Sequence, residues 1–148
     1  MRNVANLVPP FETDGKYHGV SAALEFAALN LRVKHIVVMG HSGCGGVRAC
    51  VDHGSTRQTD AAFIRNWMSM LDAPLAHLKQ EQPTLVGDDL RAALEHEAVK
   101  TSLTNLRTFP CIQILEGKGR LALHGAYFDI ASGTLEVLNN TTNTFVPI

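Results

Sequence analysis

Residues capable of chemistry gather in one glycine-rich stretch of this chain, HIVVMGHSGCGGVRAC at positions 35–50. His41 and Cys44 lie three positions apart within it, and imidazole and thiolate are both preferred zinc ligands. The glycines around them let the backbone turn tightly, so that both side chains have room to converge on one ion. The spacing therefore predicts half of a zinc site, with His41 and Cys44 as metal ligands.

A second interpretation of the same turn is anion binding by its backbone. The free N–H groups of Gly45, Gly46 and Val47 would stand at a helix N-terminus, where phosphate and carboxylate groups bind. Ser42 does not fit a serine hydrolase, because Cys44 occupies the place of the second glycine in GxSxG. The stretch is also neither GxGxxG nor GxxxxGK[ST], which argues against a nucleotide-binding module.

The elements that position this turn follow from hydrophobic patterning. The apolar run Val33–Met39 predicts a parallel strand covered on both faces, and a short helix is expected from Val47 to about Val51. Ligands of open α/β sheets bind at the carboxyl ends of strands, which is where His41 and Cys44 stand. A third ligand is not expected from the other two cysteines, because Cys50 lies well inside the helix and Cys111 lies at the start of a predicted strand. Both are predicted to be small buried hydrophobic residues.

Further helices and strands are predicted along the chain. A helix through Leu24 and Leu31 is capped by His18 or Ser21. A long helix begins at Asp60 and is divided near Pro74. A third helix begins at Asp88 or Asp89 and ends before Pro110. Strands are expected at Cys111–Leu115 and as a hairpin of 121–130 with 134–138, and Arg2–Val8 resembles a strand end. Loops are expected at 53–59 and at 139–148.

Composition limits the class of protein. The chain has 148 residues, 45% of them hydrophobic and 18% charged, with a formal net charge of -1. These values are typical of one folded domain, here residues 1–148 with an α/β fold, and they predict no nucleic-acid and no membrane partner. The start does not resemble a signal peptide, and three cysteines favour a reducing, cytoplasmic location.

Several motifs resemble the β-class carbonic anhydrases. The turn GHSGCGG at 40–46 looks like that family's signature around its second and third zinc ligands. Four other stretches fit the family in the same order: RNVAN at 2–6, SAALEFA at 21–27, SLTNL at 102–106 and HGAYFDIASGTL at 124–135. The similarity covers nearly the whole chain.

The resemblance implies a Rossmann-like, mostly parallel sheet flanked by helices, with a C-terminal hairpin. It also implies Zn2+ held by His41 and Cys44, a homodimer or higher homo-oligomer, and reversible hydration of CO2 to bicarbonate. Gly45 is the candidate backbone N–H donor of the site. The family's first zinc ligand, however, belongs to a Cys-x-Asp-x-Arg motif that precedes RNVAN, on a central strand, and residues 1–148 contain no such motif.

The missing motif leads to two expectations. The first is an amino-terminally truncated carbonic anhydrase that binds zinc weakly and has little hydratase activity unless another subunit supplies the missing strand. The second is a catalytically inactive family remnant that binds an anion or a partner subunit.

Overall fold

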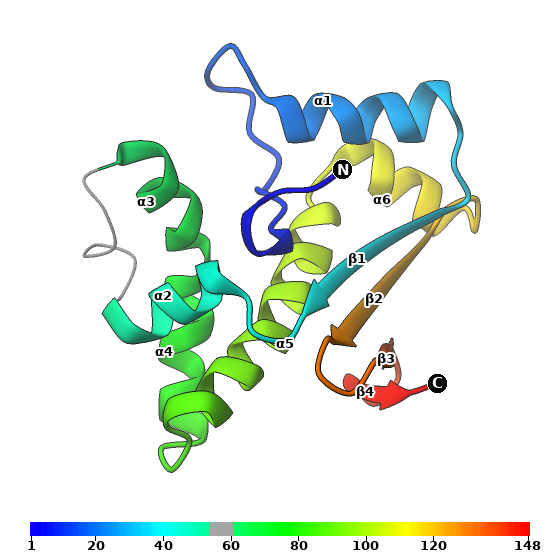
Figure 1. The fold of residues 1–148 in the computed structure, drawn as a ribbon. Coiled ribbons are helices and arrows are strands. Elements are labelled where there is room, and N and C mark those ends of the chain that lie inside the picture. Colours follow the sequence, from blue (N-terminus) through cyan, green and yellow to red (C-terminus); the bar gives the residue numbers. More distant parts are fainter. Residues whose placement is uncertain (54–60) are drawn as a thin grey trace.

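The computed structural model describes residues 1–53 and 61–148, which form an α/β arrangement of one sheet and surrounding helices (Figure 1). The helices are α1 (Gly19–Glu25), α2 (Gly45–His53), α3 (Ala62–Met68), α4 (Asp72–Glu81), α5 (Gly87–Leu106) and α6 (Pro110–Gly117). The strands are β1 (His35–His41), β2 (Ala122–Asp129), β3 (Thr134–Asn139) and β4 (Thr144–Pro147). No described helix has the length and apolar character needed to cross a membrane.

The four strands lie in the sheet in chain order, β1-β2-β3-β4. β1 and β2 are parallel, from His35 opposite Ala122 to His41 opposite Phe128. The pairs β2–β3 and β3–β4 are antiparallel. The predicted α/β class and C-terminal hairpin are confirmed, and the sheet is mixed, with one parallel and two antiparallel pairs.

β1 is covered on one face only by the described residues, so the predicted cover on both faces is wrong. Val38 and Gly40 are buried, and a Cβ atom on Gly40 would stand 2.9 Å from Cγ2 of Val99 on α5. Val37 and Met39 point to the opposite face and are 58% and 59% exposed. Among the described strands only β2 pairs with β1, which leaves the other edge of β1 open.

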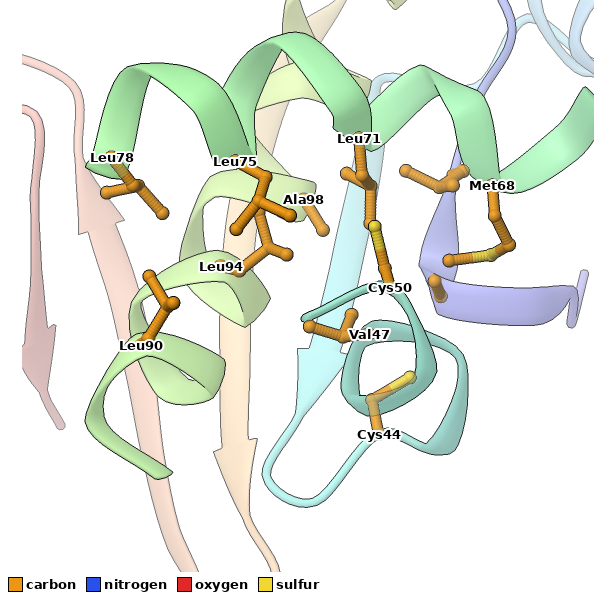
Figure 2. Close-up of a cluster of buried hydrophobic side chains, with 12 residues drawn as sticks. Cys44, Val47, Cys50, Met68, Leu71, Leu75, Leu78, Leu90, Leu94 and Ala98 are labelled. Atoms are coloured by element: carbon orange, nitrogen blue, oxygen red, sulfur yellow. The ribbon is translucent and has the colours of Figure 1, made fainter. Parts of the chain in front are cut away.

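Helix α5 joins two hydrophobic clusters. Its contacts with β1 and β2 belong to a cluster that includes Val99, Phe109 and Leu123. Its other side packs against α2 and α4, where Leu94, Leu71 and Cys50 are fully buried (Figure 2). The helix that carries the candidate turn is therefore fixed through α5 to the sheet.

The long helices broadly follow the sequence. The helix predicted to divide near Pro74 is split by a 3-10 turn at Ser69–Leu71 into α3 and α4. α5 begins one residue before the predicted start and ends before Pro110, as expected. α1 continues as one π-helical turn. His18 stands at the N-cap position of α1, but its ring does not cap the helix and is hydrogen-bonded to the Asp14 carbonyl oxygen at 2.6 Å. Residues 54–59 of the predicted loop and the predicted cap Asp60 lie outside the described residues.

Three local predictions are wrong. Cys111–Leu115 is not a strand but part of α6, because Pro110 at the first helical position favours a helix start and four apolar residues interrupted by Gln113 fit either element. Arg2–Val8 is no strand, since Ala5 and Asn6 have positive φ angles (58° and 49°) and belong to a 3-10 turn. The loop predicted at 139–148 instead contains β4, which pairs with β3, and the Ile148 N–H also donates to the Leu135 carbonyl oxygen at 3.0 Å.

Candidate metal centre

The candidate ligands stand in the connection between β1 and α2, at the carboxyl end of β1. His41 is the last residue of the strand, Cys44 directly precedes the helix, and Gly45 is the first helical residue. The turn requires glycine at position 43, whose φ of +70° lies in the left-handed region. The predicted strand, turn and helix are confirmed, with α2 starting two residues earlier than expected.

His41 presents one ring nitrogen as a potential ligand. Its side chain is exposed, and Nδ1 lies 3.0 Å from the Ser42 carbonyl oxygen. Because a carbonyl can only accept, Nδ1 carries the proton in this contact and the neutral ring keeps its lone pair on Nε2. A histidine ligand is commonly oriented by such a bond from its other nitrogen.

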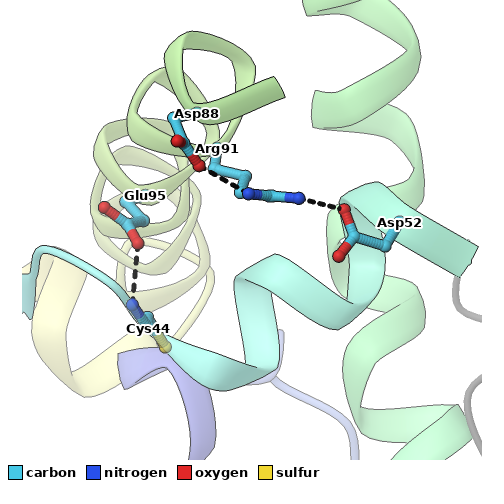
Figure 3. Close-up of polar contacts among 5 residues, drawn as sticks. All are labelled: Cys44, Asp52, Asp88, Arg91 and Glu95. Atoms are coloured by element: carbon cyan, nitrogen blue, oxygen red, sulfur yellow. Dashed lines mark hydrogen bonds and ion pairs between the residues drawn. The ribbon is translucent and has the colours of Figure 1, made fainter. Parts of the chain in front are cut away.

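Cys44 is held through its backbone by a buried carboxylate. Its N–H donates to Oε1 of Glu95 on α5 at 2.8 Å, and Glu95 is only 5% exposed (Figure 3). The other oxygen of Glu95 accepts from the Tyr127 hydroxyl of β2 at 2.7 Å. Burial, and secondarily Glu95, raise the pKa of Tyr127, so this hydroxyl stays protonated and donates. One side chain thus connects the turn, α5 and the sheet.

Ser42 connects the same turn to the β2–β3 hairpin. Its hydroxyl donates to Oδ1 of Asp129 at 2.9 Å and accepts from the Ile130 N–H at 2.9 Å. Hydrogen bonds from Ser132 and then from Ser42 lower the pKa of Asp129 below its ordinary value. The Ser42 hydroxyl therefore joins the turn to both Asp129 and Ile130.

The far end of α2 is fixed by an ion-pair cluster. Arg91 on α5 contacts Asp52 of α2 at 2.7 Å and also pairs with Asp88 (Figure 3). The Arg91 hydrogen bond lowers the pKa of Asp52, which keeps the carboxylate charged. α2 is thus attached to α5 both at its first turn, through Glu95, and at its last.

The described residues do not fit a complete zinc site. Catalytic zinc needs three protein ligands, yet no group of three or more His, Cys, Asp or Glu that could hold a metal is found within 1–53 and 61–148. Cys50 is fully buried and burial raises its pKa to about 11, which favours the neutral thiol over a ligating thiolate. The half-buried Cys111 lies on α6 and packs against the hydrophobic cluster that includes Val99 and Phe109. Within residues 1–53 and 61–148, His41 and Cys44 therefore remain a predicted pair without a third donor.

Sequence reasoning missed Glu95, Tyr127 and Asp129. A signal for Glu95 was present, because it lies on the buried stripe of α5 formed by Leu94, Ala98, Val99 and Ser102. A carboxylate on a largely apolar stripe indicates a buried polar partner. The partner itself, an amide 51 positions earlier, has no local signature.

The comparisons with known proteins agree with this architecture. A sequence model described as carbonic anhydrase matches residues 1–135. Beta carbonic anhydrase 3 of Arabidopsis thaliana is 36% identical over 138 residues, which are 93% of this chain and 53% of that protein. This chain therefore spans about half the length of that curated relative.

Solved structures show the same fold. The β-carbonic anhydrase CcaA superposes with a TM-score of 0.87 at 30% identity, over 100% of this chain and 70% of that one. One of two tetrameric β-carbonic anhydrases from Sordaria macrospora gives 0.78 at 26% identity, over 94% of this chain and 66% of that one. The family match and these relatives show that the chain belongs to the carbonic anhydrase family. More narrowly, the chain belongs to the β class.

Proposed function

We propose that residues 1–148 form the larger part of a β-class carbonic anhydrase, a lyase that interconverts CO2 and bicarbonate and depends on zinc. The observation that carries the proposal is the placement of His41 and Cys44 around one turn at the carboxyl end of β1, in a chain whose family match runs from residue 1 to 135. Open α/β sheets bind their ligands at this end of the strands.

Each residue of the turn has its own part in this proposal. His41 offers the Nε2 lone pair, and Cys44 offers a sulfur whose backbone is held by Glu95. Gly45 begins α2, so its N–H has no carbonyl partner earlier in that helix and is the candidate donor to a substrate oxygen. No proton transfer is assigned to a side chain of residues 1–148.

The third ligand would come from a Cys-x-Asp-x-Arg segment outside residues 1–148. The open edge of β1 supports a further strand next to it, and the exposed apolar side chains of Val37 and Met39 support a further layer over the second face of β1. We further propose that the protein is a homo-oligomer, in line with the tetrameric enzymes of Sordaria macrospora that share its fold. The 148-residue polypeptide alone would then bind zinc weakly and hydrate CO2 poorly.

The test compares two proteins by stopped-flow CO2 hydration. One is the 148-residue polypeptide, and the other carries a β-class amino-terminal segment with Cys-x-Asp-x-Arg fused before Arg2. We expect hydration from the fusion, its loss in the fusion with His41→Ala, and its retention with His77→Ala, a matched exposed histidine on α4. A folded fusion that retains activity without His41 would refute the assignment.

A second candidate is a non-catalytic chain that binds an anion or a partner subunit. The incomplete donor set within the described residues favours it for the 148-residue polypeptide on its own. This candidate predicts that even the folded fusion has low zinc content and no hydration. The same experiment therefore separates the two functions.

A further inference from the structure

A pocket lies at the end of the sheet opposite His41. It has a volume of about 790 Å³ and is formed where the loop before β1 meets the turn before β2. The Ala122 N–H donates to the Lys34 carbonyl oxygen at 2.9 Å, which joins these two connections, and Figure 1 shows both at the same end of the sheet. The volume is within the range of small-molecule sites.

The pocket is lined by three basic side chains: Arg32, Lys34 and Arg120. None of its described lining residues is acidic, and no salt bridge of these three side chains is found within 1–53 and 61–148. A nearby carboxylate, Glu116, is already occupied, since both its oxygens accept from Arg107 at 3.0 Å. The three positive charges are therefore left without a counter-charge from the described residues, and an anion between them would reduce their repulsion.

The pocket is separate from the candidate metal centre. His35, at the first position of β1, lines it, whereas His41 is the last residue of the same strand. Six steps at about 3.3 Å per residue place the two ends roughly 20 Å apart. A ligand in this pocket therefore does not contact the His41–Cys44 turn.

The remaining lining is mostly apolar. Ala28 and Leu121 are buried, and Leu29 and Leu115 add further hydrocarbon surface. An inorganic ion makes no use of such a surface, whereas an organic ligand buries a nonpolar body against it. Guanidinium groups match phosphate oxygens in pairs, and three cations favour a doubly charged group over a single carboxylate.

We propose that this pocket binds an organic phosphate monoester, with the phosphate between Arg32, Lys34 and Arg120 and the organic body against Leu29 and Leu121. The site is independent of the proposed carbonic anhydrase function, because it shares no residue with the turn at the carboxyl end of β1.

Phenyl phosphate is the probe, titrated by isothermal calorimetry into the purified protein. We expect saturable binding that is tighter than that of inorganic phosphate or benzoate. Arg32→Gln and Arg120→Gln are each expected to weaken it by about 10-fold or more, since each removes a charge-assisted hydrogen bond. Both side chains are exposed, so the variants should fold, which circular dichroism verifies.

Two controls give the experiment its specificity. Lys79→Gln removes an exposed cation on α4 outside the pocket and should leave binding unchanged. His41→Ala should also leave it unchanged, so failure of this proposal and failure of the hydratase proposal are distinguishable. Absence of saturable binding, equal binding by the folded arginine variants, or equally tight binding of inorganic phosphate or benzoate would each overturn the proposal.

Discussion

The Cys44 amide and the Glu95 carboxylate form a buried hydrogen bond of 2.8 Å between residues 51 positions apart. This contact fixes the candidate metal-binding turn to α5, and through Tyr127 also to the sheet. Because the carboxylate is buried, the turn and the helix depend on each other for the pairing of their polar groups.

Replacement of Glu95 tests this coupling. Glu95→Ala leaves the Cys44 N–H and the Tyr127 hydroxyl without their partner, and we expect a loss of about 2–4 kcal/mol in the free energy of unfolding. Glu95→Gln retains an acceptor for the amide and should cost about 1 kcal/mol. Urea unfolding followed by circular dichroism measures both. Equal midpoints for wild type and Glu95→Ala would show that the bond contributes nothing to stability.

Two glycines near the turn form a matched pair. A methyl group at Gly40 would lie 2.9 Å from Val99 Cγ2 and 3.3 Å from Asn6 Oδ1, so Gly40→Ala should destabilise the protein by about 1–3 kcal/mol. At Gly45 a methyl group meets nothing within 4 Å, and Gly45→Ala should be neutral or slightly stabilising. Thermal unfolding of the two variants provides the measurement. The opposite order of stability would contradict the described packing of β1 on α5.

Asp129 predicts a specific pH dependence. Its folded pKa lies below its ordinary value of 3.8, so its contribution to stability is present above about pH 4 and is lost as the pH falls through the folded pKa. Asp129→Asn lacks this contribution. The difference in unfolding free energy between wild type and variant should therefore narrow from pH 6 to pH 2.5. Asp52, whose pKa is also lowered, is present in both proteins, so its contribution cancels in this difference. A difference that stays constant would contradict the role of Asp129.

The three thiols should react in a fixed order with iodoacetamide. Cys111 is partly exposed, whereas Cys44 is 6% and Cys50 0% exposed. Burial raises the pKa of both Cys111 and Cys50, that of Cys50 to about 11. Reaction requires an accessible thiolate. Peptide mass spectrometry at pH 8 should show Cys111 labelled first and Cys50 last. Labelling of Cys50 at the rate of Cys111 would mean that α2 does not pack as described.

The sequence predicted those parts of the fold whose signals are local. The β-branched run before Gly40 and the glycines after it indicated β1, the turn and the start of α2, and Ala131, Ser132 and Gly133 indicated the hairpin. The error at Cys111–Leu115 arises because a short, mostly apolar run fits a strand and a helix equally, and Pro110 both ends one helix and favours the start of the next.

Features that depend on tertiary contacts were not predictable in this way. Whether Val37 and Met39 are covered depends on which elements pack against the second face of β1, not on the strand's own pattern. The hydrogen bond between the Cys44 N–H and Glu95 likewise forms only when α5 packs against the turn. The metal-ligand pair was predicted from its spacing, its position after β1 and the resemblance of the turn, and it stays a prediction.

The most direct test of the metal-ligand assignment is a zinc titration of the 148-residue polypeptide and its variants with a competing chromophoric chelator. We predict weak binding, lowered by about 10-fold or more in His41→Ala and in Cys44→Ser and unchanged in His77→Ala and Cys111→Ser. Zinc affinity that is insensitive to both His41→Ala and Cys44→Ser would contradict the central claim that these two residues are the metal ligands of this chain.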